Sequence, residues 1–112
     1  MTRATYEHLF KNIFLGLGSD ADLLTGAMYY GYGAPGGFCF EIFCGDEAII
    51  DNPNSPEYNV DRRVDDFLKS AHDVAENYAT NNIIMTFGTD FAYQAAHHNY
   101  KNMDKLIRYM NI

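Results

Sequence analysis

A short and almost entirely apolar run at Ile83–Phe87 stands out in the pattern of hydrophobic and polar positions. It is long enough for a buried strand and too short for a buried helix, and Gly88 ends it. Asp90 therefore follows soon after the end of a predicted strand. Because ligand sites in parallel α/β folds gather outside the carboxyl ends of the strands, Asp90 is a candidate for chemistry. The other interpretation of Asp90 is a cap for the turn or helix that follows.

Two longer stretches carry apolar residues at helical spacing. The first begins with Ser55 and Pro56, which are typical of helix starts, and continues to Tyr78. Its predicted buried stripe consists of Val60, Val64, Phe67, Leu68, Ala71, Val74, Ala75 and Tyr78. The second extends from Ala95 to Met110. Its apolar positions are Tyr100, Met103, Leu106, Ile107 and Met110. We expect the first of these helices to pack on a sheet.

Residues 29–37 contain several glycines and tyrosines and predict a loop, because such glycine density allows many turns and supports no regular ladder. Residues 37–43 are again mostly apolar and predict a second strand. Tyr32 in the loop has two interpretations. Its ring could stack on a sugar while its phenol donates a hydrogen bond, or it could pack as an ordinary aromatic side chain with its hydroxyl satisfied.

Composition and charge narrow the class of protein. The 112 residues suffice for one small domain, and 47% hydrophobic residues can build its core. The formal net charge of −7 argues against a nucleic-acid ligand, because phosphate contacts need clustered basic side chains. No apolar stretch approaches the roughly 18 residues of a membrane span. The region after Met1 lacks an apolar signal core, so we expect neither a membrane span nor a signal peptide in the chain as written.

The spacing of the cysteines and histidines allows a disulfide and disfavours a metal site. Cys39 and Cys44 are too far apart for a CxxC redox or zinc pair. Their spacing leaves a small disulfide loop and two buried free thiols equally open. His97 and His98 are adjacent in a predicted helix, where neighbouring side chains point about 100° apart. They are therefore poorly placed to chelate one metal ion together.

A glycine-rich segment, Gly16-Leu-Gly-Ser-Asp-Ala21, matches the dinucleotide-binding pattern GxGxxG/A. Asp20 and Asp22 would place negative charge at the helix start, where a pyrophosphate has to bind. We therefore interpret the match as accidental, and an unrelated nucleotide-binding α/β domain is the weakest of the hypotheses.

Four blocks of sequence in a fixed order carry a family resemblance. They are Phe38-Cys-Phe-Glu-Ile-Phe-Cys44 after the Gly/Tyr loop, Ser55-Pro-Glu-Tyr-Asn59, Met85-Thr-Phe-Gly-Thr-Asp-Phe-Ala-Tyr93, and Tyr100-Lys-Asn-Met-Asp-Lys-Leu-Ile-Arg-Tyr-Met-Asn111. Together they resemble the glycoside hydrolase family 38 α-mannosidases, above all the lysosomal enzymes of animals. The resemblance implies an α/β fold in which residues 1–112 are a segment of an irregular parallel (β/α) barrel, the N-terminal catalytic domain of that family.

The resemblance also implies a substrate, a compartment and the roles of single residues. The family carries out retaining hydrolysis of terminal α-D-mannose residues in glycoprotein-derived oligosaccharides, and its lysosomal members suggest a lysosomal parent enzyme. Asp90 matches the aspartate of the family's Met-Gly-Ser-Asp-Phe motif, the general acid/base. Tyr32 matches an active-site tyrosine that contacts substrate. Cys39 and Cys44 match a short disulfide loop of the lysosomal enzymes, which favours the disulfide.

The sequence departs from the family pattern beside the expected acid. Thr89 replaces the usual Ser or Asp, and Ala92 stands where relatives carry a polar residue such as Gln or Arg. Both positions are neighbours of Asp90, so they bear on the tuning of the acid and leave its identity in place.

Other parts of the family's active site have no counterpart in residues 1–112. The family binds zinc through a His-x-Asp pair, the nucleophilic aspartate and a late His-His-Asp block, and these motifs are missing from the sequence. Retaining hydrolysis needs a second carboxylate. We therefore expect zinc only in the full-length family enzyme and no activity from the chain alone. A fragment of an α-mannosidase is the leading hypothesis, and a short non-catalytic descendant that acts as a binding or interaction protein is the alternative.

Overall fold

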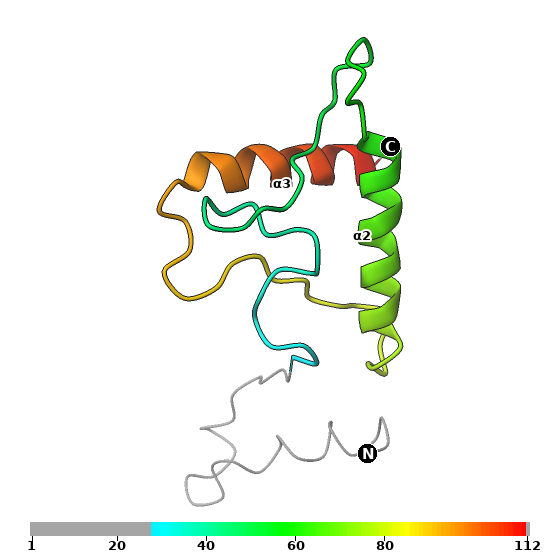
Figure 1. Cartoon of the computed structure of the whole chain (residues 1–112). Helices are drawn as coiled ribbons and strands as arrows, with labels where there is room; N and C mark the ends of the chain where they lie inside the picture. Colours follow the sequence, from blue (N-terminus) through cyan, green and yellow to red (C-terminus); the bar gives the residue numbers. More distant parts are fainter. Residues whose placement is uncertain (1–27, 112) are drawn as a thin grey trace, which may run out of the picture.

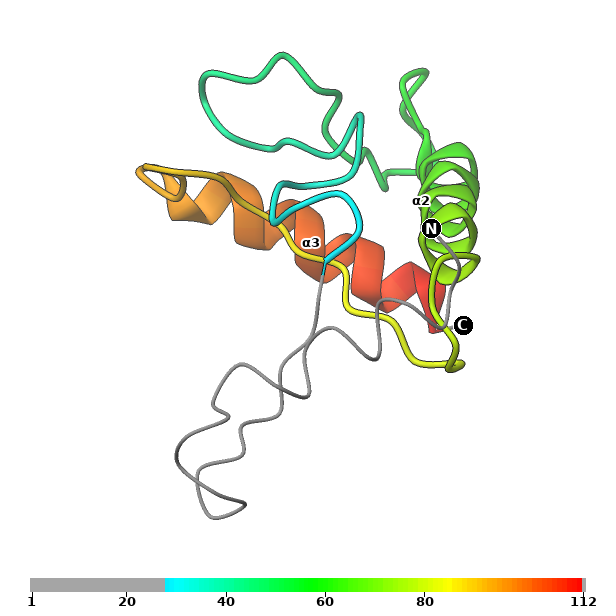
Figure 2. The same cartoon turned by 90° about the horizontal axis from the view of Figure 1, so that it is seen from below.

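The computed structural model describes residues 28–111, and within this range the regular elements are two helices, α2 and α3 (Figure 1). Helix α2 extends over Val60–Ala75 and α3 over Ala96–Met110. The carboxyl end of α3 lies against the amino-terminal part of α2 in both views (Figures 1 and 2). The remaining chain, residues 28–59 and 76–95, consists of turns and irregular segments, most of which lie in the angle between the two helices, while the green loop that leads into α2 projects beyond it.

Helix α2 begins at Val60, so the predicted start at Ser55 is wrong. Ser55 instead organises a turn, in which the amide of Glu57 donates to the Ser55 hydroxyl (3.2 Å). The start of the helix is set by Asn59. Its carboxamide oxygen accepts from the amide of Ile50 (2.8 Å), while its backbone carbonyl accepts from the amide of Arg63 (3.0 Å). Because the Asn59 side chain is bound to the preceding segment, the chain turns into the helix only after this residue.

A small core lies where the two helices meet the irregular segments. Its buried members are Phe38, Phe40, Ile49, Val60, Phe67 and Leu106. The predicted stripe of α2 is therefore correct at its centre, whereas Leu68 remains 40% exposed. Arg63 is buried as well, and its guanidinium lies 4.1 Å above the ring of Phe38 and donates to the carbonyl of Gly37 (2.6 Å). A buried charged residue on this face was not predicted from the apolar pattern.

The buried face of α3 differs from the predicted one. Asn99 and Asn102 are buried beside Leu106, whereas Tyr100 and Ile107 are each 56% exposed. The reason is the polar backbone that α3 meets. The carboxamide oxygen of Asn102 accepts from the amide of Ile49 (2.8 Å), which would otherwise be buried without a partner. Satisfying this backbone group orients the helix so that Leu106 is buried as predicted, while Tyr100 and Ile107 lie on the outside.

Neither predicted strand forms within residues 28–111. Residues 37–43 turn instead, with the amide of Phe38 donating to the carbonyl of Pro35 (2.9 Å) and the amide of Cys44 donating to the carbonyl of Glu41 (3.0 Å). Residues 83–87 run between the helices, yellow in Figure 1, without a ladder. A strand exists only when a neighbour accepts and donates its backbone hydrogen bonds. The described part of the chain supplies no such neighbour for either segment.

The structure contains the disulfide Cys39–Cys44, with the two Cα atoms 5.7 Å apart, which confirms the pairing expected from the resemblance. No helix in the described range is long and apolar enough to cross a membrane. The Gly16–Ala21 segment with its possible nucleotide-binding pattern lies outside the described residues.

Candidate functional site

The two residues singled out for chemistry, Tyr32 and Asp90, are in direct contact although 58 positions separate them. The phenol of Tyr32 donates a hydrogen bond to Oδ1 of Asp90 (2.7 Å). Both side chains are exposed, so a ligand could reach them from solvent. The hydrogen bond and the negative charge of Asp90 raise the pKa of Tyr32 above its usual value of 10.0. The phenol therefore stays protonated and donates its hydrogen bond to one oxygen of the carboxylate.

Asp90 sits in an unusual turn formed by residues 88–93. Phe91 and Tyr93 have φ values of 60° and 66°, in the left-handed region that side chains other than glycine rarely adopt. Each such residue costs on the order of 1–3 kcal/mol. Gly88 has φ 137°, and a Cβ there would lie 3.0 Å from Cε2 of Tyr93. A turn of this kind persists only when surrounding contacts hold it.

Tyr93 is the residue through which these contacts act. Its hydroxyl donates to the carbonyl of Phe87 (2.8 Å), so the aromatic side chain reaches back across the turn. Burial raises the pKa of Tyr93, and the hydroxyl stays protonated as a donor. Its amide donates to both carboxylate oxygens of Glu41, at 3.1 and 3.0 Å. Within the turn itself, the amide of Ala92 donates to the carbonyl of Thr89 (3.1 Å).

Sequence reasoning assigned Glu41 no role in this site. It is only 5% exposed, and its Oε1 also accepts a hydrogen bond from the carboxamide of Asn99 in α3. The signal in the sequence was an acidic residue inside an otherwise apolar run between the two cysteines. A strand interpretation gave this carboxylate no particular partner, whereas the disulfide loop turns it inward.

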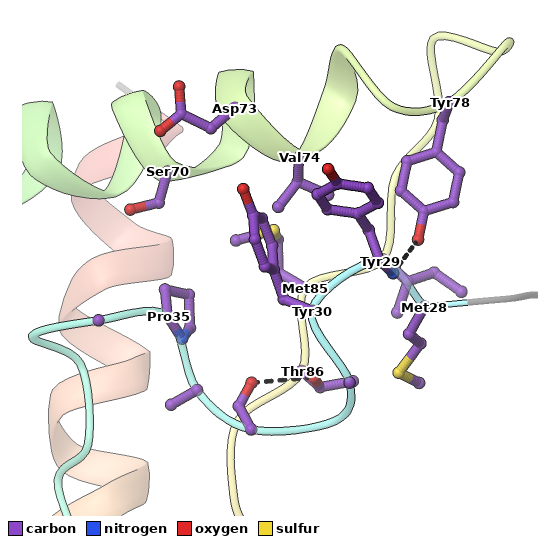
Figure 3. Close-up of a pocket in the computed structure, with 15 residues that line it drawn as sticks. Met28, Tyr29, Tyr30, Pro35, Ser70, Asp73, Val74, Tyr78, Met85 and Thr86 are labelled. Atoms are coloured by element: carbon purple, nitrogen blue, oxygen red, sulfur yellow. Dashed lines mark hydrogen bonds between the residues drawn. The ribbon is translucent and has the colours of Figure 1, made fainter. Parts of the chain in front are cut away.

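A cavity of about 340 Å³ lies next to this site but does not include Tyr32 or Asp90 (Figure 3). Tyr29, Tyr30 and Pro35 form one wall, the end of α2 forms another, and Met85 and Thr86 close it. The hydroxyl of Thr86 donates to the carbonyl of Gly33 (3.2 Å) and joins two of these walls. Tyrosine rings line the cavity, and the hydroxyl of Tyr78 accepts a hydrogen bond from the amide of Tyr29 (3.0 Å). The arrangement suited to proton transfer is the exposed pair of Tyr32 and Asp90, whose carboxylate and phenol are in contact.

The described residues offer no metal centre, since no three His, Cys, Asp or Glu side chains between positions 28 and 111 come together in a suitable group. The rings of His97 and His98 have their centroids 4.1 Å apart and touch each other. The zinc expected for the family enzyme therefore does not fit these residues, and no chemical step can be derived from it here.

Sequence comparisons place the chain among known enzymes. The family described as "Glycosyl hydrolases family 38 N-terminal domain" matches residues 15–112. The chain belongs to this family. Members are glycosidases, so the chain derives from a hydrolase by descent.

The relatives in this family are named as α-mannosidases. Lysosomal alpha-mannosidase of Cavia porcellus is 44% identical over 92 residues, which covers 82% of this chain. The enzymes of the same name from Homo sapiens and Mus musculus are 44% and 45% identical over 91 residues, each covering 81% of the chain. The chain spans only 9% of the length of these three relatives. The roles of Asp90 and Tyr32 stay predictions from the resemblance.

Proposed function

We propose that this chain is the acid/base segment of a retaining α-mannosidase that acts on terminal α-D-mannose of glycoprotein-derived oligosaccharides. The observation that carries the proposal is the hydrogen bond from Tyr32 to Asp90, because it joins the two positions that the family resemblance assigns to substrate contact and proton transfer. Membership of the family adds the reaction class. The names of the relatives suggest that the parent enzyme is lysosomal.

In the proposed mechanism, Asp90 gives a proton to the glycosidic oxygen as the bond to mannose breaks. The same carboxylate then takes a proton from the water that hydrolyses the glycosyl-enzyme ester. Tyr32 binds Oδ1 of Asp90 and restricts its rotation, which leaves Oδ2 to face the leaving group. The ester forms on a second carboxylate that this chain is not expected to supply. Residues 1–112 alone should therefore not turn over substrate.

We further propose that these residues are part of an irregular parallel (β/α) barrel, the N-terminal catalytic domain of the family. Two observations support this. Residues 83–87 form no strand pairing in the described structure, and the apolar side chain of Ile84 is 76% exposed. The apolar stripe of α3 at Tyr100 and Ile107 is also exposed. Neighbouring strands and helices of a larger domain would cover both surfaces.

A short binding protein without catalysis is the second candidate. It is favoured by the same exposed apolar side chains, including Phe91 at 86% exposure beside the candidate site. Such side chains suit a partner surface as well as the interior of a larger domain.

The two candidates are separated by the coding sequence around this region and by an activity assay. We expect flanking sequence that encodes His-x-Asp upstream and His-His-Asp downstream, and a full-length product that hydrolyses an aryl α-mannoside with retention of configuration. The 112-residue chain serves as the control and should be inactive. A message that encodes only these residues, or turnover by the isolated chain, would contradict the proposal.

A further inference from the structure

The buried carboxylate of Glu41 lies directly beneath the turn that carries Asp90. Within residues 28–111, no Lys or Arg forms an ion pair with it; the ion pairs join other acids. Burying an unpaired carboxylate is costly unless hydrogen bonds replace its water. Here the donors are the amide of Tyr93, which contacts both oxygens, and the carboxamide of Asn99. Such a costly group at this place calls for a role beyond packing.

The donors connect Glu41 to the two segments that fix Asp90. The Tyr93 amide closes the carboxyl end of the turn, where the backbone has a positive φ. Asn99 belongs to the first part of α3, the helix that follows the turn. Glu41 thus joins the end of the Asp90 turn to the start of α3. The hydroxyl of Tyr93, at the carboxyl end of the turn, donates to the carbonyl of Phe87, which immediately precedes the turn.

The disulfide loop explains how Glu41 is held in place. Glu41 lies between Cys39 and Cys44, and its carbonyl accepts from the amide of Cys44 (3.0 Å). The neighbours Ile42 and Phe43 point outward, with 63% and 59% exposure. The amide of Cys39 is bound by the carboxylate of Asp46 (2.8 Å). The loop therefore presents one carboxylate inward from a cross-linked backbone.

We propose that Glu41 is a positioning residue: by binding the Tyr93 amide and Asn99, it holds the turn of residues 88–93 and keeps the Asp90 carboxylate against the Tyr32 phenol. Its consequence for catalysis rests on the proposed function, but the positioning itself does not. The role depends on an acceptor at this place more than on negative charge. Asn99 could reverse its carboxamide, whose Oδ1 is buried without a partner, and accept from a neutral amide at position 41.

The test uses the 112-residue chain and two readouts that need no turnover. Hydrogen exchange reports on the Tyr93 amide, and a ¹³C NMR titration of the tyrosine Cζ atoms reports on Tyr32. Glu41→Met removes the acceptor at similar length, Glu41→Gln keeps an acceptor without charge, and Glu57→Met makes the same change at an exposed acid outside the turn. Asp90→Asn defines the titration of Tyr32 without its charged partner.

In Glu41→Met, the Tyr93 amide should exchange at least about tenfold faster, as expected for the loss of one hydrogen bond to a charged group. The pKa of Tyr32 should fall toward 10, as in Asp90→Asn. Glu41→Gln should stay close to wild type in both readouts, and so should Glu57→Met. If Glu41→Met does not fold, Glu41→Asp is used instead, since it withdraws the acceptor by one methylene and should shift both readouts in the same direction.

Wild-type exchange at Tyr93 together with wild-type titration of Tyr32 in Glu41→Met, or in its Asp substitute, would overturn the proposal. So would an unchanged Tyr32 titration in Asp90→Asn, because the contact that Glu41 is said to maintain would then be absent in solution. Neither result depends on whether the longer enzyme hydrolyses mannosides, so the positioning role and the proposed function can fail separately.

Discussion

At the scale of single residues, the candidate site depends on backbone conformations that few residues can adopt. Gly88, Phe91 and Tyr93 all have positive φ within six positions, and Asp90 stands between them. Only Gly88 adopts such a conformation without steric cost. The unfavourable conformations of the other two are compensated by the bonds of Tyr93 to Phe87 and Glu41. The position of the carboxylate is therefore a property of the whole turn.

Replacing Gly88 with Ala tests this view of the turn. The new Cβ would lie 3.0 Å from the ring of Tyr93. The alanine would also have to adopt a φ of 137°, which residues with a side chain rarely do. We expect the free energy of unfolding to fall by on the order of 1–3 kcal/mol. Urea unfolding measures it, with Gly45→Ala as the control because nothing lies within 4 Å of a Cβ there. Equal stability of the two variants would contradict the account.

At the scale of elements, α3 is attached to the loop before α2 mainly by polar contacts. Lys105 forms an ion pair with Asp51 (2.7 Å) and donates to the carbonyl of Ile49 (2.8 Å). Tyr109 donates to the second oxygen of Asp51 (3.3 Å). The hydrogen bond from Lys105 lowers the pKa of Asp51 below its usual 3.8. Because the folded-state pKa is depressed, the pair stabilises the fold above the unfolded pKa and ceases to do so as pH falls through the folded value.

The lowered pKa of Asp51 gives a prediction for acid unfolding. Asp51→Asn should lower the free energy of unfolding near neutral pH by about 1 kcal/mol or less, the range of partly exposed ion pairs. The difference from wild type should shrink between about pH 5 and the acid unfolding transition. Asp104→Asn, an exposed position on α3, is the matched control. A difference that grows as pH falls would contradict the assigned role of the pair.

The two helices were predictable from the sequence because their apolar spacing is local, and α3 begins one residue from its predicted start. The predictions that proved wrong concern features that depend on residues distant in the sequence. Strands at 37–43 and 83–87 require neighbours that local patterns cannot supply. The buried face of α3 is set by Asn99 and Asn102, which meet Glu41 and the Ile49 amide from far along the chain. Asp90 and Tyr32 could be named beforehand, but their contact could not.

At the scale of the whole molecule, α3 buries polar side chains and exposes apolar ones. The face toward the core carries Asn99, Asn102 and Leu106, and the outer face exposes an apolar stripe with Tyr100 and Ile107. Exposed apolar stripes of this kind favour association in water. The net charge of −7 opposes association only in part. The exposed stripe supports the proposal that these residues belong to a larger domain.

Ile107→Lys tests the role of this outer face. The change places a charge in the middle of the apolar stripe and should reduce concentration-dependent self-association of the 112-residue chain, measured by sedimentation velocity. His72→Lys adds the same charge on an exposed position of α2, away from the stripe, and should leave association unchanged. Equal effects of both variants would mean that net charge, and not this face, governs association.

The proposed mechanism requires Asp90 to donate the proton to the leaving group. The most direct measurement is kcat/KM of Asp90→Asn in the proposed full-length α-mannosidase, with mannosides of poor and of activated leaving groups, and with Asp65→Asn, an exposed position on α2, as control. We predict a loss of about 10²–10⁴-fold for poor leaving groups. Activated aryl mannosides, which depart without a proton, should lose little. An equal loss with both substrates, or none, would contradict the claim.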